Sequence, residues 1–391
     1  MRRHPFVALF LCVASPLVCA AEEGAWLRSG WQPYAGGLVG SGDAYKEERD
    51  HWLRSRLKFS GKTARTSDGI DGTVGVATDR LLGQKDTIGL DYRNNQSYQT
   101  DTRSSQMSLR YGFPAGANKV NIEAGKSRYS RAVSNGSGRV EASGEARDLN
   151  LTASRPLFSR FGMSFDGVAR HRGRDSASFK DDSLISESRH QVSSFGLDAK
   201  GGHELMFGFV ANTHIQALSG REYRSTDYSM QEGISDERDF YKVAVSGSIE
   251  QAVFQWNWRV NGRYQFSDED LPSSEYLTVA GSSMMAGFNG QSVAAFKGGW
   301  LRVGTDSPPW STPFTQNVLS SINLSVLQGW VPDSGAQAHR HGKASAGQVA
   351  LKMQGRAFTA NVSVGRMISN SNAALTMPDY PDLRFSLSMD I

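Results

Sequence analysis

The chain has almost no cysteine. Its two cysteines, Cys12 and Cys19, both lie within the first 21 of 391 residues. That segment has a basic start, an apolar run over residues 6–17 and small residues around Ala20, which is the pattern of a cleaved secretory signal. Residues 1–21 are therefore predicted to be removed. The mature chain would then contain no thiol, which excludes disulfides and metal–thiolate sites and suits an exported protein.

The chain also has little imbalance of charge and no long apolar run. Without Arg2 and Arg3, 41 basic residues face 39 acidic ones, a net charge of +2, so no nucleic-acid partner is predicted. No later stretch approaches the roughly 18 apolar residues of a spanning helix. Mean hydropathy is −0.43, and no apolar series of the helical period persists. A helical membrane protein is thereby excluded.

Strict alternation is what the chain has instead. In the last ten residues, 382–391, every odd position is apolar and every even one is polar or charged. Successive strand side chains point to opposite faces, so such a strand is apolar on one side and wet on the other. The same stripe recurs along most of the chain. This pattern predicts an all-β fold, a transmembrane antiparallel β-barrel with lipid outside and water in the lumen.

Sixteen strands are predicted from residue 52 onward. The 340 residues of 52–391 give roughly 21 per strand with its connection, which fits strands of about 10 residues and their loops. Residues 22–51 are too few for a domain of their own and are interpreted as a periplasmic lead-in or a lumen plug. The candidate strands centre on residues 53–59, 74–76, 88–92, 107–113, 120–124, 149–151, 161–165, 195–199, 205–211, 241–249, 254–266, 300, 322–326, 349–353, 358–364 and 382–391.

Short and long polar connections alternate between these candidates. Short turns inside and long loops outside are the rule for outer-membrane barrels, so both termini are predicted to be periplasmic. A Pro-rich insert at 304–316 is irregular. The predicted short connections are 82–85, 114–117, 155–159, 201–203 and 251–253, and the predicted long ones are 172–189, 219–238 and 267–297.

The alternation also assigns a face to each side chain. The arginines expected to face the lumen are interpreted as part of a generic polar wall rather than as a path that binds a substrate. Residues expected to meet lipid are Phe254, Trp256, Trp258, Val260, Phe385, Leu387 and Met389. Residues expected to face the lumen are Arg54, Arg56, Gln255, Arg259, Arg263 and Arg384.

One long connection carries a motif. It contains Leu271-Pro272-Ser273-Ser274-Glu275, then Gly281, then Met285-Ala286-Gly287-Phe288. This series resembles the inward-folded loop of two-partner secretion transporters, the haemolysin secretion/activation barrels of the ShlB/FhaC/HecB type. Residues 82–86, 111–116 and 154–157 resemble turns of the same family, in the same order. On these residues the barrel is identified as a member of that family.

The resemblance implies a function in protein export. Proteins of this family pass one large β-helical partner protein, unfolded, through the lumen and across the outer membrane, with no cofactor and no bond chemistry. The implied partners are outer-membrane lipid, the secreted protein, and the barrel assembly machinery for insertion, and the barrel is expected to be a monomer. No nucleophile or metal motif suggests an enzyme.

Three departures from the family pattern bear on that expectation. Only about thirty residues precede the barrel, so the family's periplasmic POTRA domains are predicted to be absent. Ala286 stands where the family has a loop arginine. The expected acidic partner falls within residues 326–329, which contain no acid.

The loop is therefore expected to be held without a charge pair. Neutral hydrogen bonds and packing of Met284, Met285 and Phe288 should fix it in the lumen, with Gly281 and Gly287 allowing tight turns. Two alternatives to export remain, a passive porin-like channel and a transport-inactive barrel with a structural or accessory role. A neighbouring gene for a large secreted repeat protein would favour export, whereas a stable open conductance would favour the channel.

Overall fold

The computed structural model describes most of the chain after residue 56. The described ranges are 57–65, 69–79, 86–97, 102–135, 138–181, 183–228, 231–268, 271–312, 315–333 and 340–390. The predicted boundaries of the signal and of the lead-in segment, together with Arg54 and Arg56, lie outside these ranges.

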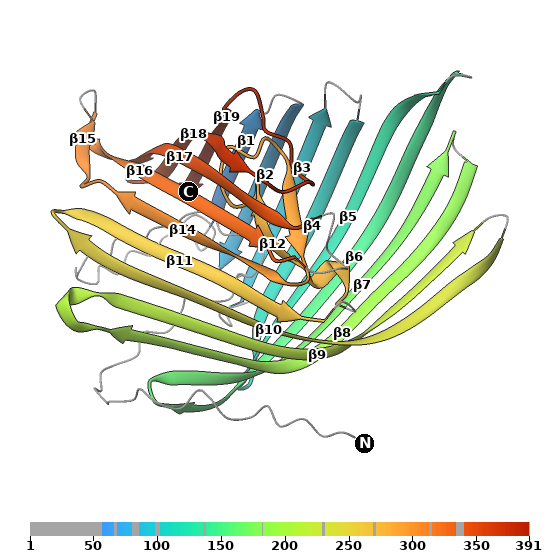
Figure 1. Ribbon diagram of the computed structural model, residues 1–391, viewed down its shortest axis with the longest axis horizontal. Coiled ribbons are helices and arrows are strands. Elements are labelled where there is room, and N and C mark those ends of the chain that lie inside the picture. The colour runs from blue at the N-terminus through green and yellow to red at the C-terminus, as the bar shows by residue number, and fades with distance from the viewer. Residues whose placement is uncertain are drawn as a thin grey trace, which may run out of the picture.

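Sixteen antiparallel strands close into a barrel within the described ranges (Figure 1). Closure is made by the first and last strands, which pair from Lys58 with Asp390 to Arg65 with Leu383. A short extra strand, β15 (Trp310–Thr312), pairs with β16 beyond the end of β14 and accounts for part of the Pro-rich insert. The barrel strands are β1 (Leu57–Arg65), β2 (Gly69–Asp79), β3 (Thr87–Ser97), β4 (Thr102–Ala115), β5 (Asn118–Asn135), β6 (Gly138–Arg160), β7 (Met163–Lys180), β8 (Ser183–Glu204), β9 (Val210–Tyr228), β10 (Gln231–Val253), β11 (Trp256–Ser267), β14 (Gly298–Asp306), β16 (Thr315–Val331), β17 (Gly342–Gln354), β18 (Phe358–Asn370) and β19 (Asp382–Asp390).

The predicted strand count is confirmed, since each candidate overlaps a different strand, but the ninth candidate, 205–211, is mostly the 3-10 turn η1 (Met206–Gly208), and several predicted turns are wrong. Residues 155–159, 201–203 and 251–253 lie inside β6, β8 and β10. The chain instead reverses a few residues later, at Phe161, Phe207 and Phe254, each of which has a positive φ. The predicted inner turn at 154–157 is likewise a stretch of β6 that ends in a register shift.

The prediction that Phe254 and Gln255 are strand residues on opposite faces is therefore wrong. They form the two-residue reversal between β10 and β11, and the Phe254 side chain is 94% exposed. The reversal pairs Val253 directly with Trp256, so the outward face continues across the turn. The alternation of apolar residues in β11 therefore continues to Phe254 in the turn, and the sequence alone gives no sign of where the strand begins.

Two of the predicted long loops are hairpins. Residues 172–189 and 219–238 mostly belong to β7–β8 and β9–β10, which are among the longest strands and form the tall wall in Figure 1. Their register is held by cross-strand ion pairs such as Arg189–Asp175, 3.1 Å, and Arg221–Asp239, 2.7 Å. Opposite charges facing across strands stabilise pairing without any apolar stripe. The absence of that stripe is why the sequence suggested loops.

The two faces of the wall differ as the alternation predicts. Trp258, Val260, Phe385 and Met389 are exposed on the outer surface. Inward positions on β11, β14 and β16 include Gln265, Arg302 and Ser325, all buried. No helix among the described residues has the length and hydropathy needed to cross a bilayer.

Arginine substitutions on the two faces of β4 test which side chains point outward and which point into the lumen. Leu109 is exposed on the outer surface, so Leu109→Arg should lower the free energy of unfolding by roughly 2–4 kcal/mol near the bilayer midplane. The matched change, Ser108→Arg, points inward opposite Asp91 and should cost much less. Denaturant titration in lipid vesicles measures both values. Equal costs would contradict the assignment of faces.

Candidate functional site in the barrel lumen

A long connection between β11 and β14 fills part of the lumen. It contains a 3-10 turn, η2 (Ser273–Glu275), and a two-stranded hairpin of β12 (Leu277–Gly281) and β13 (Ser292–Ala295). Figure 1 draws β12 within the ring of strands. The loop thus lies where the family resemblance places it, and its contacts with the wall define the candidate site.

The hairpin end of the loop is seated on an apolar part of the wall. Phe288 and Met285 of the loop and Leu327 of β16 have almost no exposed surface and belong to one cluster. Burying a side chain of this size contributes about 1.5–3 kcal/mol. The loop members are Leu277, Val279, Ala280, Met285, Phe288, Val293 and Ala295, and the members outside the loop are Leu327, Val331, Ala344, Ala346, Met367 and Leu375.

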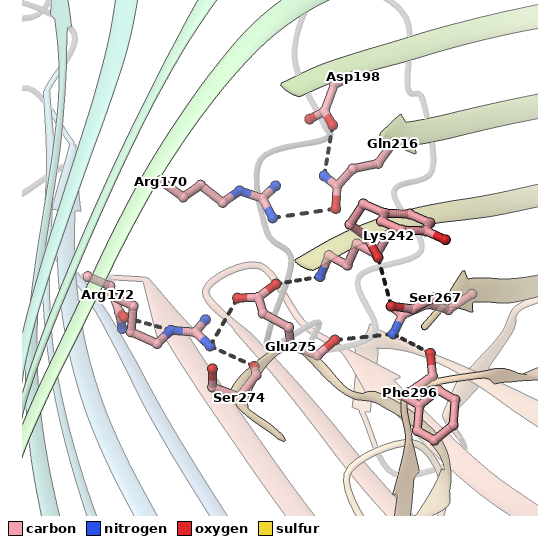
Figure 2. Close-up of polar contacts among 12 residues, drawn as sticks. Arg170, Arg172, Asp198, Gln216, Lys242, Ser267, Ser274, Glu275 and Phe296 are labelled. Atoms are coloured by element: carbon pink, nitrogen blue, oxygen red, sulfur yellow. Dashed lines mark hydrogen bonds and ion pairs between the residues drawn. The ribbon is translucent and has the colours of Figure 1, made fainter. Parts of the chain in front are cut away.

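The other end of the loop is held by an ion-pair cluster, which we call the latch: Glu275, Lys242 and Arg172. The Glu275 carboxylate contacts the Lys242 ammonium of β10, and both side chains are buried. Arg172 of β7 lies 3.5 Å from the same carboxylate and donates a hydrogen bond of 2.7 Å to the Ser274 carbonyl. Figure 2 shows the Glu275 carboxylate between the two cations. The latch therefore joins the loop to two separate strands of the wall.

Glu275 is ionised in this setting. Burial alone would raise the pKa of its carboxyl, but attraction to Lys242, the hydrogen bond from Lys242 and attraction to Arg172 outweigh burial and hold the pKa below its usual value. Gln265 of β11 adds neutral support by donating its side-chain amide to the carbonyls of Glu275, 3.2 Å, and Phe296, 3.1 Å. A buried pair of this kind is costly to break, because the remaining charge has no partner.

The tip of the loop is bound through its backbone. The Ala286 N–H donates to Gln348 Oε1 of β17 at 2.8 Å, and the Gly287 N–H donates to Asp382 of β19 at 3.1 Å. Arg384 pairs with the buried Asp382 at 2.6 Å and also donates to the carbonyl of Ser282. This part of the wall therefore supplies two acceptors and one charged donor to the loop backbone.

The two glycines of the motif act differently. Gly287 has φ +111°, and a Cβ there would lie 2.7 Å from the backbone of Arg366, so a turn close to the wall requires glycine. Gly281 ends β12, and its carbonyl accepts a hydrogen bond from the Met284 N–H at 3.0 Å, so a tight turn does begin there, although Gly281 itself has no positive φ. A Cβ on Gly281 would meet Ser292 at 2.5 Å, so close strand approach is the constraint there.

The expectation that only neutral bonds hold the loop is also wrong. Besides the latch and Arg384, Arg302 of β14 donates to the Met284 carbonyl at 3.2 Å. The wall thus supplies the cations and the loop supplies the acid, the reverse of an arginine on the loop. Within 326–329 the buried inward residues are Leu327 and Gly329, so an apolar contact occupies the stretch where an acid was expected.

The remaining motif and lumen residues have distinct places. Leu271 packs against Phe240 and Phe296, and Pro272 is fully buried. Arg259 pairs with Glu250 on the neighbouring strand at 2.7 Å, as part of the wall. Sequence reasoning missed Lys242, Arg172 and Asp382; their only sequence signal is a charge at an inward position, which many wall residues share.

The chain matches known proteins along most of its length. The family model of the haemolysin secretion/activation protein ShlB/FhaC/HecB matches residues 46–351. The Escherichia coli outer membrane transporter CdiB is 23% identical over 236 residues, 60% of this chain and 39% of the relative. Its Dickeya dadantii counterpart is 21% identical over 314 residues, 79% of this chain and 55% of the relative. The chain thus spans about half the length of these relatives.

Solved structures share the fold. CdiB from Escherichia coli superposes with a TM-score of 0.68 at 17% identity, covering 88% of this chain and 63% of that one. CdiB from Acinetobacter baumannii gives 0.64 at 16% identity, covering 86% and 60%.

Removing the latch carboxylate should destabilise the protein. Glu275→Gln leaves Lys242 buried and charged without its partner, which should cost about 3–5 kcal/mol of unfolding free energy. Adding Lys242→Met should recover most of that loss, and a double-mutant cycle in lipid vesicles measures the coupling. The control is Glu250→Gln, which breaks the more exposed pair with Arg259 and should cost only about 0–1 kcal/mol. Equal losses at Glu275 and Glu250 would refute the latch.

Proposed function

Because the chain belongs to the haemolysin secretion/activation protein family ShlB/FhaC/HecB, we propose that it exports a large partner polypeptide across the outer membrane by two-partner secretion. The closed barrel with an apolar outer surface, and the similarity to outer membrane transporters, support an outer-membrane location. The partner would cross unfolded, as an extended chain, without bond chemistry in the barrel.

The observation that carries this proposal is the loop inside the lumen. It is seated by an apolar cluster at one end and by the latch at the other, with no covalent attachment to the wall apart from its own two ends. Hydrogen bonds to charged groups contribute about 1.5–3 kcal/mol each, so a polypeptide that replaced them with its own contacts could displace the loop. The loop is then a gate that closes the resting pore.

A lumen occupied by the loop supports export of a polypeptide rather than a passive channel. A porin needs a lumen that stays open, whereas here buried residues from loop and wall interlock, including Phe288, Leu327 and Met367. We further propose that the barrel acts as a monomer inserted by the barrel assembly machinery, and that its secreted partner is a large β-helical protein, as the family implies.

Loss of the gene should remove one large protein from the culture medium of the Gram-negative host. Mass spectrometry of the medium from a deletion strain should show that loss, and wild-type complementation should restore the protein. A Lys242→Cys, Glu275→Cys variant should restore it only until a short bis-methanethiosulfonate reagent, which forms a disulfide with each thiol, ties the loop to β10. Reduction should then reverse the block.

The matched control ties two wall strands without touching the loop. Glu250 and Arg259 are directly opposite on β10 and β11, so Glu250→Cys with Arg259→Cys can be bridged by the same reagent. Export should continue in that variant. An unchanged set of secreted proteins in the deletion strain, together with a steady open conductance of the purified barrel, would contradict the proposal and indicate a passive channel.

A further inference from the structure

Two lumen arginines close to the latch have no carboxylate partner. Arg170 of β7 makes one weak hydrogen bond, 3.4 Å, to the neutral amide oxygen of Gln216. Arg263 of β11 is largely buried, and its Nε has no hydrogen-bond partner among the residues that the structure describes. Within the same ranges neither guanidinium lies within 4 Å of a carboxylate, unlike most lumen arginines of this barrel.

Arg170 reaches Gln216 of β9, which is paired through Ala244 of β10 with Gln265, two residues from Arg263 on the same face of β11. The two guanidinium groups thus lie on one stretch of the lumen wall, close enough to repel each other.

The surrounding charges do not neutralise them. The more distant carboxylates that attract them are already occupied, because Asp198 accepts from Gln216 at 2.7 Å and lies near Lys200 and His214, while Glu275 belongs to the latch. The permanent cations are Arg170, Arg172, Lys200, Lys242 and Arg263, and the acids are Asp166, Asp198 and Glu275.

The arrangement is thus two positive charges in excess around a buried, unsatisfied donor. A buried N–H without an acceptor is destabilising, and two like charges in a partly dehydrated wall add to that cost. An oxyanion between the guanidinium groups would relieve both at once. Guanidinium is suited to this because its planar donors match the two oxygens of a carboxylate or phosphate.

We propose that Arg170 and Arg263 form an oxyanion-binding site on the lumen wall. Its ligand is a carboxylate or phosphate oxyanion, supplied either by a free anion or by an acidic side chain of a polypeptide in the lumen. The site adjoins Lys242, so a bound anion competes with Glu275 for that ammonium and weakens the latch. This last step rests on the proposed gating function, whereas binding itself does not.

Thermal unfolding of the purified full chain tests the site. The probes are inorganic phosphate and hexaglutamate, each compared with chloride at equal ionic strength. Both should raise the Tm of the wild type, because a ligand bound only by the folded state stabilises it. Arg263→Gln should weaken the apparent affinity by about tenfold or more, the equivalent of one charge-assisted hydrogen bond. A stronger effect of hexaglutamate than of phosphate would identify polypeptide as the source of the anion.

Arg110→Gln is the matched control, since Arg110 has its own carboxylate, Asp91, on a wall strand away from the latch. This variant should keep the full response to both probes. In chloride alone, Arg263→Gln should be at least as stable as the wild type, because it removes an uncompensated charge. No difference between the probes and chloride, or an equal response in Arg263→Gln, would overturn the proposal. The assay contains no secreted partner, so its failure is distinct from a failure of export.

Discussion

Pairing of every backbone polar group in hydrocarbon is the constraint on which the rest of this structure depends. An open sheet edge in a bilayer leaves N–H and C=O groups unsatisfied at several kcal/mol each, so the first strand must meet the last. The pairing of β1 with β19 meets that requirement. Once the ring is closed, one face of each strand meets lipid and the other encloses a lumen. A loop that enters the lumen is then surrounded by wall side chains that can bind it.

The lumen wall binds that loop in two different ways. Near β16 to β18 the contact is apolar, with Leu327 against the hairpin, and near β7 and β10 it is ionic, through Glu275. Apolar packing offers no charge for a ligand to compete for, whereas the ionic end depends on a buried pair that is stable only while each charge keeps a partner. The excess of positive charge at Arg170 and Arg263 lies at the ionic end. The latch is thus the part of the loop whose contacts a bound anion would compete for.

The sequence predicted the barrel because lipid enforces a period of two on each strand, as in the terminal series Leu383 to Met389. The prediction failed where the strands lack an alternating apolar pattern. Toward the hairpin ends of β7–β10, charged pairs such as Arg221–Asp239 are exposed, and no alternating apolar pattern marks these residues as strands. The sequence did not predict the latch, for another reason. Lys242 and Glu275 meet only because the ring brings their strand and loop together, and each resembles any other lumen charge in the sequence.

The central claim is that the loop rests in the lumen and that Glu275 keeps it there. Both natural cysteines lie in the predicted signal segment, so spin labels can be placed at Ser273→Cys, an exposed position beside the latch in η2, and at Ser369→Cys on β18. Electron paramagnetic resonance in outer membranes then measures the distance between them. One narrow distance distribution is expected for the native latch, and a broader, longer one in Glu275→Gln. A distribution that is already broad, or one that Glu275→Gln leaves unchanged, would contradict the claim.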